Sequence, residues 1–331
     1  PKAILFLVAI LMFAANTFNL AADLAGIVAT IRLVYPISSL LIGSILVAII
    51  LLSLIFFSFS KLAVIFRWLT LPLLAYIGSA LLSGLSAREM LTATFLPQFH
   101  FNKITLITLT AILGTTISPY LFFWQTNEEI EEKRHHENLS SAKELKNMRL
   151  DVIIGMFLSN LVSYFIIATA AATFHRQGID TLTTIDQATQ SLIPIAGSFA
   201  AFLFSIGILG TGMLAIPVLA GSAAYVVAES FGWEEGLDRK FKEAPKFYLV
   251  IIASTLIGLA LSQFQFDPIK LLFYTAVVYG ILSPFLILLI LLIGNNRALI
   301  GNQVNGPISN FINLGTFAIM SLAATSLLFV N

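Results

Sequence analysis

Long apolar windows with at most one charged residue alternate along the chain with short polar connections. Nine windows are wide enough for the ~20 apolar residues that a helix needs to cross a bilayer. Lipid leaves the backbone of an open strand unpaired, and no window alternates with period 2, so each window predicts a membrane-spanning α-helix. The predicted spans are residues 4–28, 37–57, 64–83, 104–125, 152–173, one crossing within 188–228, 247–262, 271–293 and 308–330.

The window at 188–228 is long enough for nearly two crossings, and small residues or a proline, such as Gly207 and Pro217, could mark a break inside it. A single crossing places most Lys and Arg residues on one side of the membrane, which the positive-inside rule assigns to the cytoplasm. We therefore expect one crossing, cytoplasmic connections at 127–151 and 229–246, and a cell-membrane location. Close helix packing is the favoured interpretation of the small residues.

Composition agrees with an integral membrane protein. Of the 331 residues, 58% are hydrophobic and only 11% are charged, and the mean hydropathy is +0.94. A soluble domain has about 25% charged residues, so the chain lacks the polar surface of a soluble enzyme or a nucleic-acid binder. The absence of Cys excludes disulfides and a Cys nucleophile. Membrane lipid is the expected surrounding, and no oligomer is required.

The segment Gly114-Thr-Thr-Ile-Ser-Pro-Tyr120 predicts a broken helix inside one span. Pro119 has no N–H and cannot bond the carbonyl of Thr115. An unwound turn at membrane depth offers bare carbonyl oxygens and half-helix ends, which transporters use to bind ions. The alternative is a plain proline kink in which the hydroxyl of Thr116 or Ser118 bonds back to the backbone.

Three polar residues interrupt the first span. Asn16, Asn19 and Asp23 are spaced three and four residues apart, so they share one helical face. A carboxylate inside an apolar helix is expensive and usually faces a cavity, a partner or a proton route. The alternative is a polar seam that holds neighbouring helices together.

Sequence signatures of enzymes are missing. The chain has no HExxH, GxSxG, P-loop or GxGxxG motif, so we expect no enzyme activity and no cofactor. His135 and His136 follow four glutamates and could attract a metal ion loosely. A solvated continuation of the preceding helix is the favoured interpretation of this segment.

These features together resemble one transporter family. Residues 113–125, followed by Glu128 and Glu129, resemble the sixth helix of the Nramp family of divalent metal transporters, in a bacterial branch. Residues 15–25 resemble the third helix of that family, the 188–228 window its eighth, and Ser283-Pro-Phe285 its tenth. The resemblance runs in the family's order over essentially the whole chain.

The resemblance implies a LeuT-type fold of two inverted five-helix repeats. Residues 1–85 would then form the end of the first repeat, 104–296 the second repeat and 308–330 an extra helix. The chain begins at Pro1 rather than Met, and we expect the first two helices to be absent. The family's Asp-Pro-Gly-Asn metal ligands belong to the first of those helices.

The resemblance also implies site residues. In the family's sixth helix a Met sulfur and a backbone carbonyl three residues earlier bind the metal ion. Ser118 occupies the Met position and Thr115 the carbonyl position, and Gly114 and Pro119 flank the helix break. Ser118 offers a hard oxygen in place of a soft sulfur, which predicts a preference for hard ions such as Mn²⁺ or Mg²⁺.

This chain retains only some of the side chains that the family uses for proton movement and metal binding. Asp23 matches the third-helix Asp of the family, but its neighbouring Glu falls on Gly26. The two His residues of the sixth helix fall on Tyr120 and Gln125, and a tenth-helix Gln falls on Ala276. We expect Asp23, Tyr120 and Gln125 to be proton-linked groups or to lie just behind the metal ligands, with proton coupling open.

Three functions remain open at this stage. The favoured hypothesis is a secondary transporter of divalent metal ions (Mn²⁺, Fe²⁺ or Mg²⁺) that works by alternating access. The second is a Na⁺- or H⁺-coupled symporter for amino acids or organic solutes with the same fold. The third is an intramembrane enzyme or a non-transporting assembly subunit. Competition between Mn²⁺ and amino acids separates the first two, and ion flux in liposomes eliminates the third.

Overall fold

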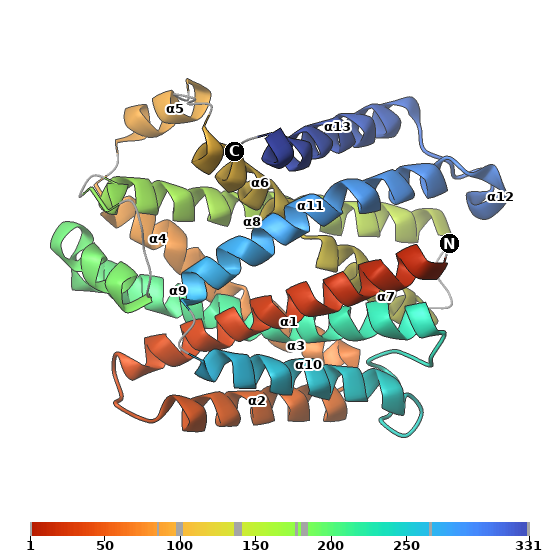
Figure 1. Cartoon of the computed structure of the whole chain (residues 1–331), viewed down its shortest axis with the longest axis horizontal. Helices are drawn as coiled ribbons and strands as arrows, with labels where there is room; N and C mark the ends of the chain where they lie inside the picture. The colour runs from red at the N-terminus through yellow and green to blue at the C-terminus, as the bar shows by residue number, and fades with distance from the viewer. Residues whose placement is uncertain are drawn as a thin grey trace. The chain divides into compact units, whose positions relative to one another are not determined.

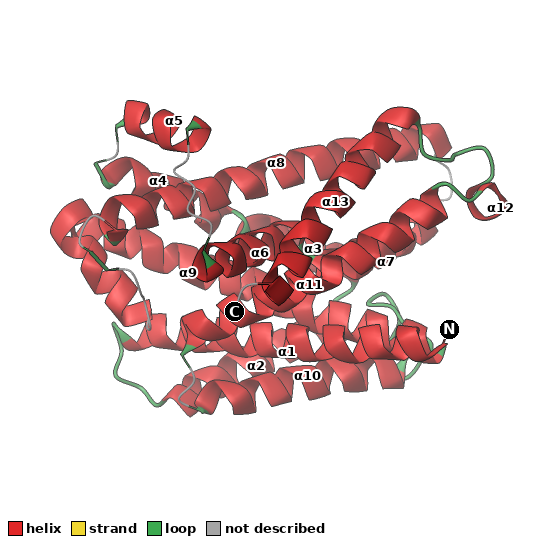
Figure 2. Ribbon diagram, turned by 45° about the horizontal axis from the view of Figure 1, so that its top comes forward, coloured by secondary structure: helices red, strands yellow, loops and turns green. Residues whose placement is uncertain are grey.

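The computed structural model describes residues 2–84, 86–96, 102–135, 141–175, 178–179, 185–264 and 267–329. This part of the chain is helical, without strands (Figure 2). The elements in Figure 1 are α1 (Lys2–Arg32), α2 (Ser39–Phe56), α3 (Phe59–Leu69), the 3₁₀ turn η1 (Leu71–Leu73), α4 (Leu74–Leu82), α5 (Ala87–Phe95), α6 (Lys103–Ile117), α7 (Pro119–His135), α8 (Ser141–Thr173), α9 (Ile185–Phe231), α10 (Pro245–Gln263), α11 (Pro268–Gly294), α12 (Arg297–Ile300) and α13 (Pro307–Phe329).

The predicted number of membrane spans is confirmed. Within the described residues, nine helical stretches are long and apolar enough to cross a membrane. Each coincides with one predicted window, and the 188–228 window holds a single stretch, Gly197–Phe231. The helix break predicted near 114–119 is also present, since α6 ends at Ile117 and α7 begins at Pro119.

Helix α9 breaks earlier than the small residues suggested. Gly197 has φ 79° and ψ 169°, a backbone conformation that glycine adopts easily, and the helix then continues to Phe231. The later glycines pack against neighbours instead. A Cβ on Gly207 would lie 2.6 Å from the ring of Tyr76, and one on Gly212 would lie 2.7 Å from the side chain of Ile27. Packing, not helix breaking, is therefore their role.

Two predicted segments differ in detail. The span at 64–83 is divided by η1, because Pro72 lacks the N–H that a continuous helix needs. The charged connection at 127–151 is mostly helical, since α7 continues to His135 and α8 begins at Ser141. The expected continuation of the helix is therefore confirmed as far as His135. His136 lies outside the described residues.

The helices divide into two compact units. Unit 1 comprises Pro1–Gln98 and Phe123–Leu271, and unit 2 comprises Phe99–Phe122 and Leu272–Asn331. In unit 1, α1 packs on α9 and α10, and α10 also packs on α2; both views show α1, α10 and α2 side by side (Figures 1 and 2). The buried face of α1 follows helical spacing and includes Leu20, Leu24 and Ile27. In unit 2, α6 packs on α13.

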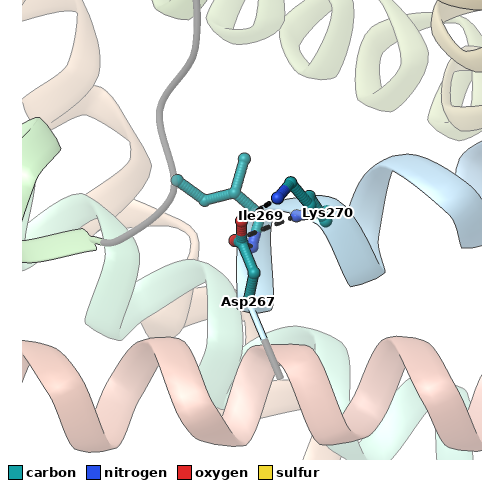
Figure 3. Close-up of polar contacts among 3 residues, drawn as sticks. All are labelled: Asp267, Ile269 and Lys270. Atoms are coloured by element: carbon teal, nitrogen blue, oxygen red, sulfur yellow. Dashed lines mark hydrogen bonds and ion pairs between the residues drawn. The ribbon is translucent and has the colours of Figure 1, made fainter. Parts of the chain in front are cut away.

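The start of α11 is fixed by an aspartate (Figure 3). Oδ1 of Asp267 accepts hydrogen bonds from the backbone N–H groups of Ile269 (3.0 Å) and Lys270 (3.2 Å). Its other carboxylate oxygen lies 3.6 Å from Nζ of Lys270. A side chain that accepts from the first free N–H groups stabilises a helix start by about 1 kcal/mol. Asp267 therefore determines where this span begins.

Candidate transport site at a helix break

The break between α6 and α7 is centred on Ser118. This residue has φ 47° and ψ 74°, and it is the one non-glycine residue with positive φ among those described. Pro119 causes the break, because it lacks an N–H and disfavours helical geometry in the residue before it. A left-handed conformation costs an L-residue about 1–3 kcal/mol, and such strain is concentrated at functional sites.

The hydrogen bonds at the break bring Thr115 and Ser118 together. The N–H of Ser118 donates to the carbonyl of Gly114 (3.0 Å), and the N–H of Leu121 donates to the carbonyl of Ser118 (2.8 Å). The Ser118 hydroxyl donates to the carbonyl oxygen of Thr115, the acceptor that Pro119 leaves without its helical donor. Two hard oxygens thus lie next to each other, and this bond fits either interpretation of the turn, an ion site or a kink closed by a hydroxyl.

The α6 turn beside the break lies directly against α11 within unit 2. A Cβ on Gly114 would overlap the carbonyl oxygen of Ala276 and would lie 2.8 Å from Cα of Gly280. A Cβ on Gly280 would in turn lie 2.5 Å from the carbonyl oxygen of Thr110. Only glycines permit this backbone approach. Ala276, where the resemblance places a tenth-helix Gln, therefore lies beside the break.

Tyr120 and Gln125 both lie on α7, beyond the break. The ring of Tyr120 is half-buried and its centroid lies 5.4 Å from that of Tyr279 on α11, within unit 2. Gln125 is half-buried and belongs to unit 1. Of the predicted site residues, Thr115, Ser118 and Tyr120 therefore share one unit, while Gln125 and Asp23 belong to the other.

Asp23 lies on α1, in the core of unit 1. Its Oδ2 is buried and accepts no hydrogen bond from the described residues. The Asp23 backbone adjoins Gly212 of α9, where a Cβ would lie 3.6 Å from the Asp23 carbonyl oxygen. Two turns earlier, Nδ2 of Asn16 donates to the carbonyl of Leu219 on α9 at 3.4 Å. Asn16 therefore joins two helices, as the polar seam interpretation expects. Asp23 instead keeps a buried carboxylate oxygen that accepts no hydrogen bond from the described residues.

A buried polar stripe on α7 was not predicted. Trp124, Asn127, Glu128 and Glu131 are each less than 10% exposed, and their spacing of three, four and seven residues places them on one helical face. Helical spacing from Trp124 could have predicted this buried face, because the same side of α7 continues into the acidic segment. The charge of the glutamates predicts a solvated helix end, and this prediction is wrong for Glu128 and Glu131, which are buried.

Glu131 joins α7 to the connection between α9 and α10. Its carboxylate accepts hydrogen bonds from the Tyr225 hydroxyl (2.6 Å) and from the N–H groups of Leu237 (2.9 Å) and Asp238 (2.9 Å). One turn earlier, Nδ2 of Asn127 donates to Oε1 of Glu229 at 2.9 Å. Bonds to an ionised carboxylate are stronger than neutral ones. They hold the α7 end firmly on α9 within unit 1.

No group of three or more His, Asp or Glu residues able to hold a metal ion occurs among the described residues. The loose metal site considered at His135 and His136 falls on side chains outside the described part of the chain. The oxygens at the break therefore remain the candidate ligands that the structure brings together.

Comparisons with known proteins give one family. A family model described as natural resistance-associated macrophage protein-like (Nramp) matches residues 1–330. Among similar proteins are those named divalent metal cation transporter MntH from Caldanaerobacter subterraneus subsp. tengcongensis (23% identical; 76% of this chain, 57% of the relative), Mycobacterium leprae (25%; 71% and 53%) and Clostridium acetobutylicum (26%; 66% and 48%). The chain spans about half the length of these relatives.

Proposed function

The chain belongs to the Nramp family, and from this premise we propose that the protein transports divalent metal ions across a membrane by alternating access. The match over residues 1–330 and the names of the MntH relatives support this proposal. The nine candidate spans and the broken helix agree with the LeuT-type arrangement that the family resemblance implies. The relatives' names describe transporters, not enzymes.

The observation that supports the proposal most is the paired oxygens at the break. The Thr115 carbonyl and the Ser118 hydroxyl would form this chain's contribution to the metal site, and Gly114 and Pro119 keep the turn open against α11. The hydroxyl proton can rotate away from the carbonyl, so that both oxygens face an entering cation. Oxygen ligands suit Mn²⁺ and Mg²⁺ better than softer ions.

The position of the break in the chain suggests how the site changes access. Helix α6 belongs to unit 2, and the chain enters unit 1 at Phe123, five residues after Ser118. Transporters of this kind alternate by rocking one bundle against another around a fixed site. We propose that the turn at Ser118 bends during this motion while Glu131 keeps α7 attached to α9. The charged connections at 127–151 and 229–246 would lie in the cytoplasm.

Asp23 is our proposed proton site. It has a buried carboxylate oxygen without a hydrogen-bond donor among the described residues, inside a membrane span. Ionisable residues in such positions usually serve ion or proton movement. A proton on Asp23 would remove the charge from this buried carboxylate, and its release would couple to movement of the cation.

Metal influx into liposomes tests the proposed function. We expect the purified protein, with whatever residues precede Pro1 in its gene, to admit Mn²⁺ faster than protein-free vesicles do, without competition from a mixture of amino acids. An inward proton gradient should accelerate influx if Asp23 releases its proton on the inner side. Amino-acid uptake without Mn²⁺ influx would favour the solute symporter, for which a hydroxyl and a free carbonyl are equally suitable. The absence of any flux would contradict transport.

A further inference from the structure

An apolar groove opens in unit 1 where three spans end on the same side. It has a volume of about 430 Å³, in the range of small-molecule sites (roughly 300–1,000 Å³). The start of α1, the end of α9 and the start of α10 enclose it. All its lining residues except one lysine are apolar: Phe6, Ala9, Ile10, Phe13, Val227, Phe231, Trp233, Leu249, Val250, Ala253 and Lys246.

Aromatic rings and a lysine form the outer rim of the groove. The rings of Phe231 and Trp233 are stacked with centroids 4.8 Å apart, and Phe6 lies 4.9 Å from Phe231. Nζ of Lys246 lies 5.0 Å from the centroid of the Trp233 ring, within the range of a cation–π contact. Tryptophan and lysine at the end of a span are typical of the headgroup level of a bilayer. The groove therefore extends from the headgroup level into the hydrocarbon layer.

A second, more polar hollow adjoins the groove at its rim. It has a volume of about 270 Å³ and shares Trp233 and Lys246 with the groove. Its other lining residues are Gly232, Glu234, Glu243 and Pro245. Lys246 and two glutamates thus line the hollow at the open end of the apolar groove; Glu234 is already paired with Arg239 (2.7 Å), so Lys246 and Glu243 are the charges that face the hollow. This charge pattern is complementary to a group that carries one negative and one positive charge.

We propose that the groove and the hollow together bind a phospholipid whose headgroup carries a primary ammonium. One acyl chain lies in the groove, the phosphate contacts Lys246, and the ammonium donates a hydrogen bond to Glu243. A purely anionic headgroup would bring its charge close to Glu243 without a cation to offer it. A headgroup methylated at nitrogen would keep its charge but would lose its N–H donors, and with them the bond to Glu243.

Native mass spectrometry of the purified protein in detergent measures this preference. Dioleoyl phosphatidylethanolamine should be retained about tenfold more than dioleoyl phosphatidylcholine, the difference expected from one charge-assisted hydrogen bond. The two lipids share their acyl chains and net charge, so the comparison isolates the headgroup nitrogen, which carries N–H donors in one lipid and methyl groups in the other. Glu243→Gln should reduce the ratio, whereas Lys242→Gln, a change of an exposed residue on the same connection outside the hollow, should leave it unchanged.

Filling the groove gives an independent test. Ala253→Trp should remove the retained lipid, because Ala253 lines the groove, whereas Ala260→Trp on the same helix lies outside it and should not. Equal retention of both lipids by the unchanged protein, or equal loss in the two tryptophan variants, would overturn the proposal and indicate only bulk lipid contact. Retention of phosphatidylglycerol above phosphatidylethanolamine would overturn the assignment of the ammonium.

Discussion

Replacing Gly114 with valine is expected to remove most of the folded protein. A Cβ at this position would overlap the backbone of α11 at Ala276 and Gly280, and backbone atoms cannot move aside as a flexible side chain can. Overpacking a tight contact costs about 1–3 kcal/mol or more. The extra methyl groups of valine add to that cost beside the strained turn at Ser118. We expect the yield of monodisperse protein in size-exclusion chromatography to fall about tenfold.

Gly155→Val provides the matched control. Gly155 lies inside α8, and a Cβ there would meet nothing within 4 Å. The control has the same change in helix propensity, a small gain because glycine is a poorer helix former than valine, without the collision. We expect it to keep nearly normal yield. If both variants gave the same yield, the close contact of α6 with α11 would be wrong.

Glu131→Gln is expected to lower the thermal stability of the protein strongly. The carboxylate accepts three hydrogen bonds from buried donors, and the amide of glutamine turns at least one acceptor into a donor. A buried donor left without a partner costs about 1–3 kcal/mol, and the lost charge weakens the remaining bonds. We expect a loss of about 2–4 kcal/mol in unfolding free energy by the same reasoning. A thermal-shift assay in detergent measures it as a lower melting temperature.

The control for Glu131 is Asp151→Asn. Asp151 is exposed on α8, so the same loss of one negative charge should change the melting temperature little. An unchanged melting temperature for Glu131→Gln would show that the carboxylate does not hold α7 on the connection between α9 and α10. Equal decreases for both variants would indicate a general effect of charge.

The spans and the helix break could be predicted because each rests on a local property of the sequence. Apolar length determines the spans, and Pro119 determines the break by removing a donor. The break at Gly197 was not foreseen because the more closely spaced glycines, such as Gly207, are indistinguishable from it until their neighbours are known. Gly207 packs on Tyr76, which is more than 100 residues away in the sequence.

The stripe around Glu131 was missed for a different reason. Helical spacing from Trp124 places Glu131 on the buried face of α7. The hydrogen-bond donors of Glu131, however, lie in distant segments of the chain. A glutamate in an acidic segment is normally solvated, and the burial of Glu131 and its donors, Tyr225, Leu237 and Asp238, show that this one is not. The residue type shows that Glu131 carries a charge, whereas the distant donors that bind this charge are known only from the tertiary structure.

The roles of the individual site residues remain predictions from the resemblance. The structure brings Thr115 and Ser118 together, but the same hydroxyl contact also closes a plain kink. Asp23 and Gln125 belong to the other unit. The candidate site thus consists of the Thr115 carbonyl and the Ser118 hydroxyl at one turn. A change in ion preference after substitution of Ser118 would identify it as a metal site.

The most direct test is the ratio of Cd²⁺ to Mg²⁺ influx into liposomes for Ser118→Met and for the unchanged protein. A thioether binds soft ions and is of little use to Mg²⁺, so the ratio should rise if Ser118 contacts the transported ion. Ser163→Met, a change of an exposed residue on α8, should leave the ratio unchanged. An unchanged ratio in Ser118→Met, with influx preserved, would contradict a metal site at the helix break.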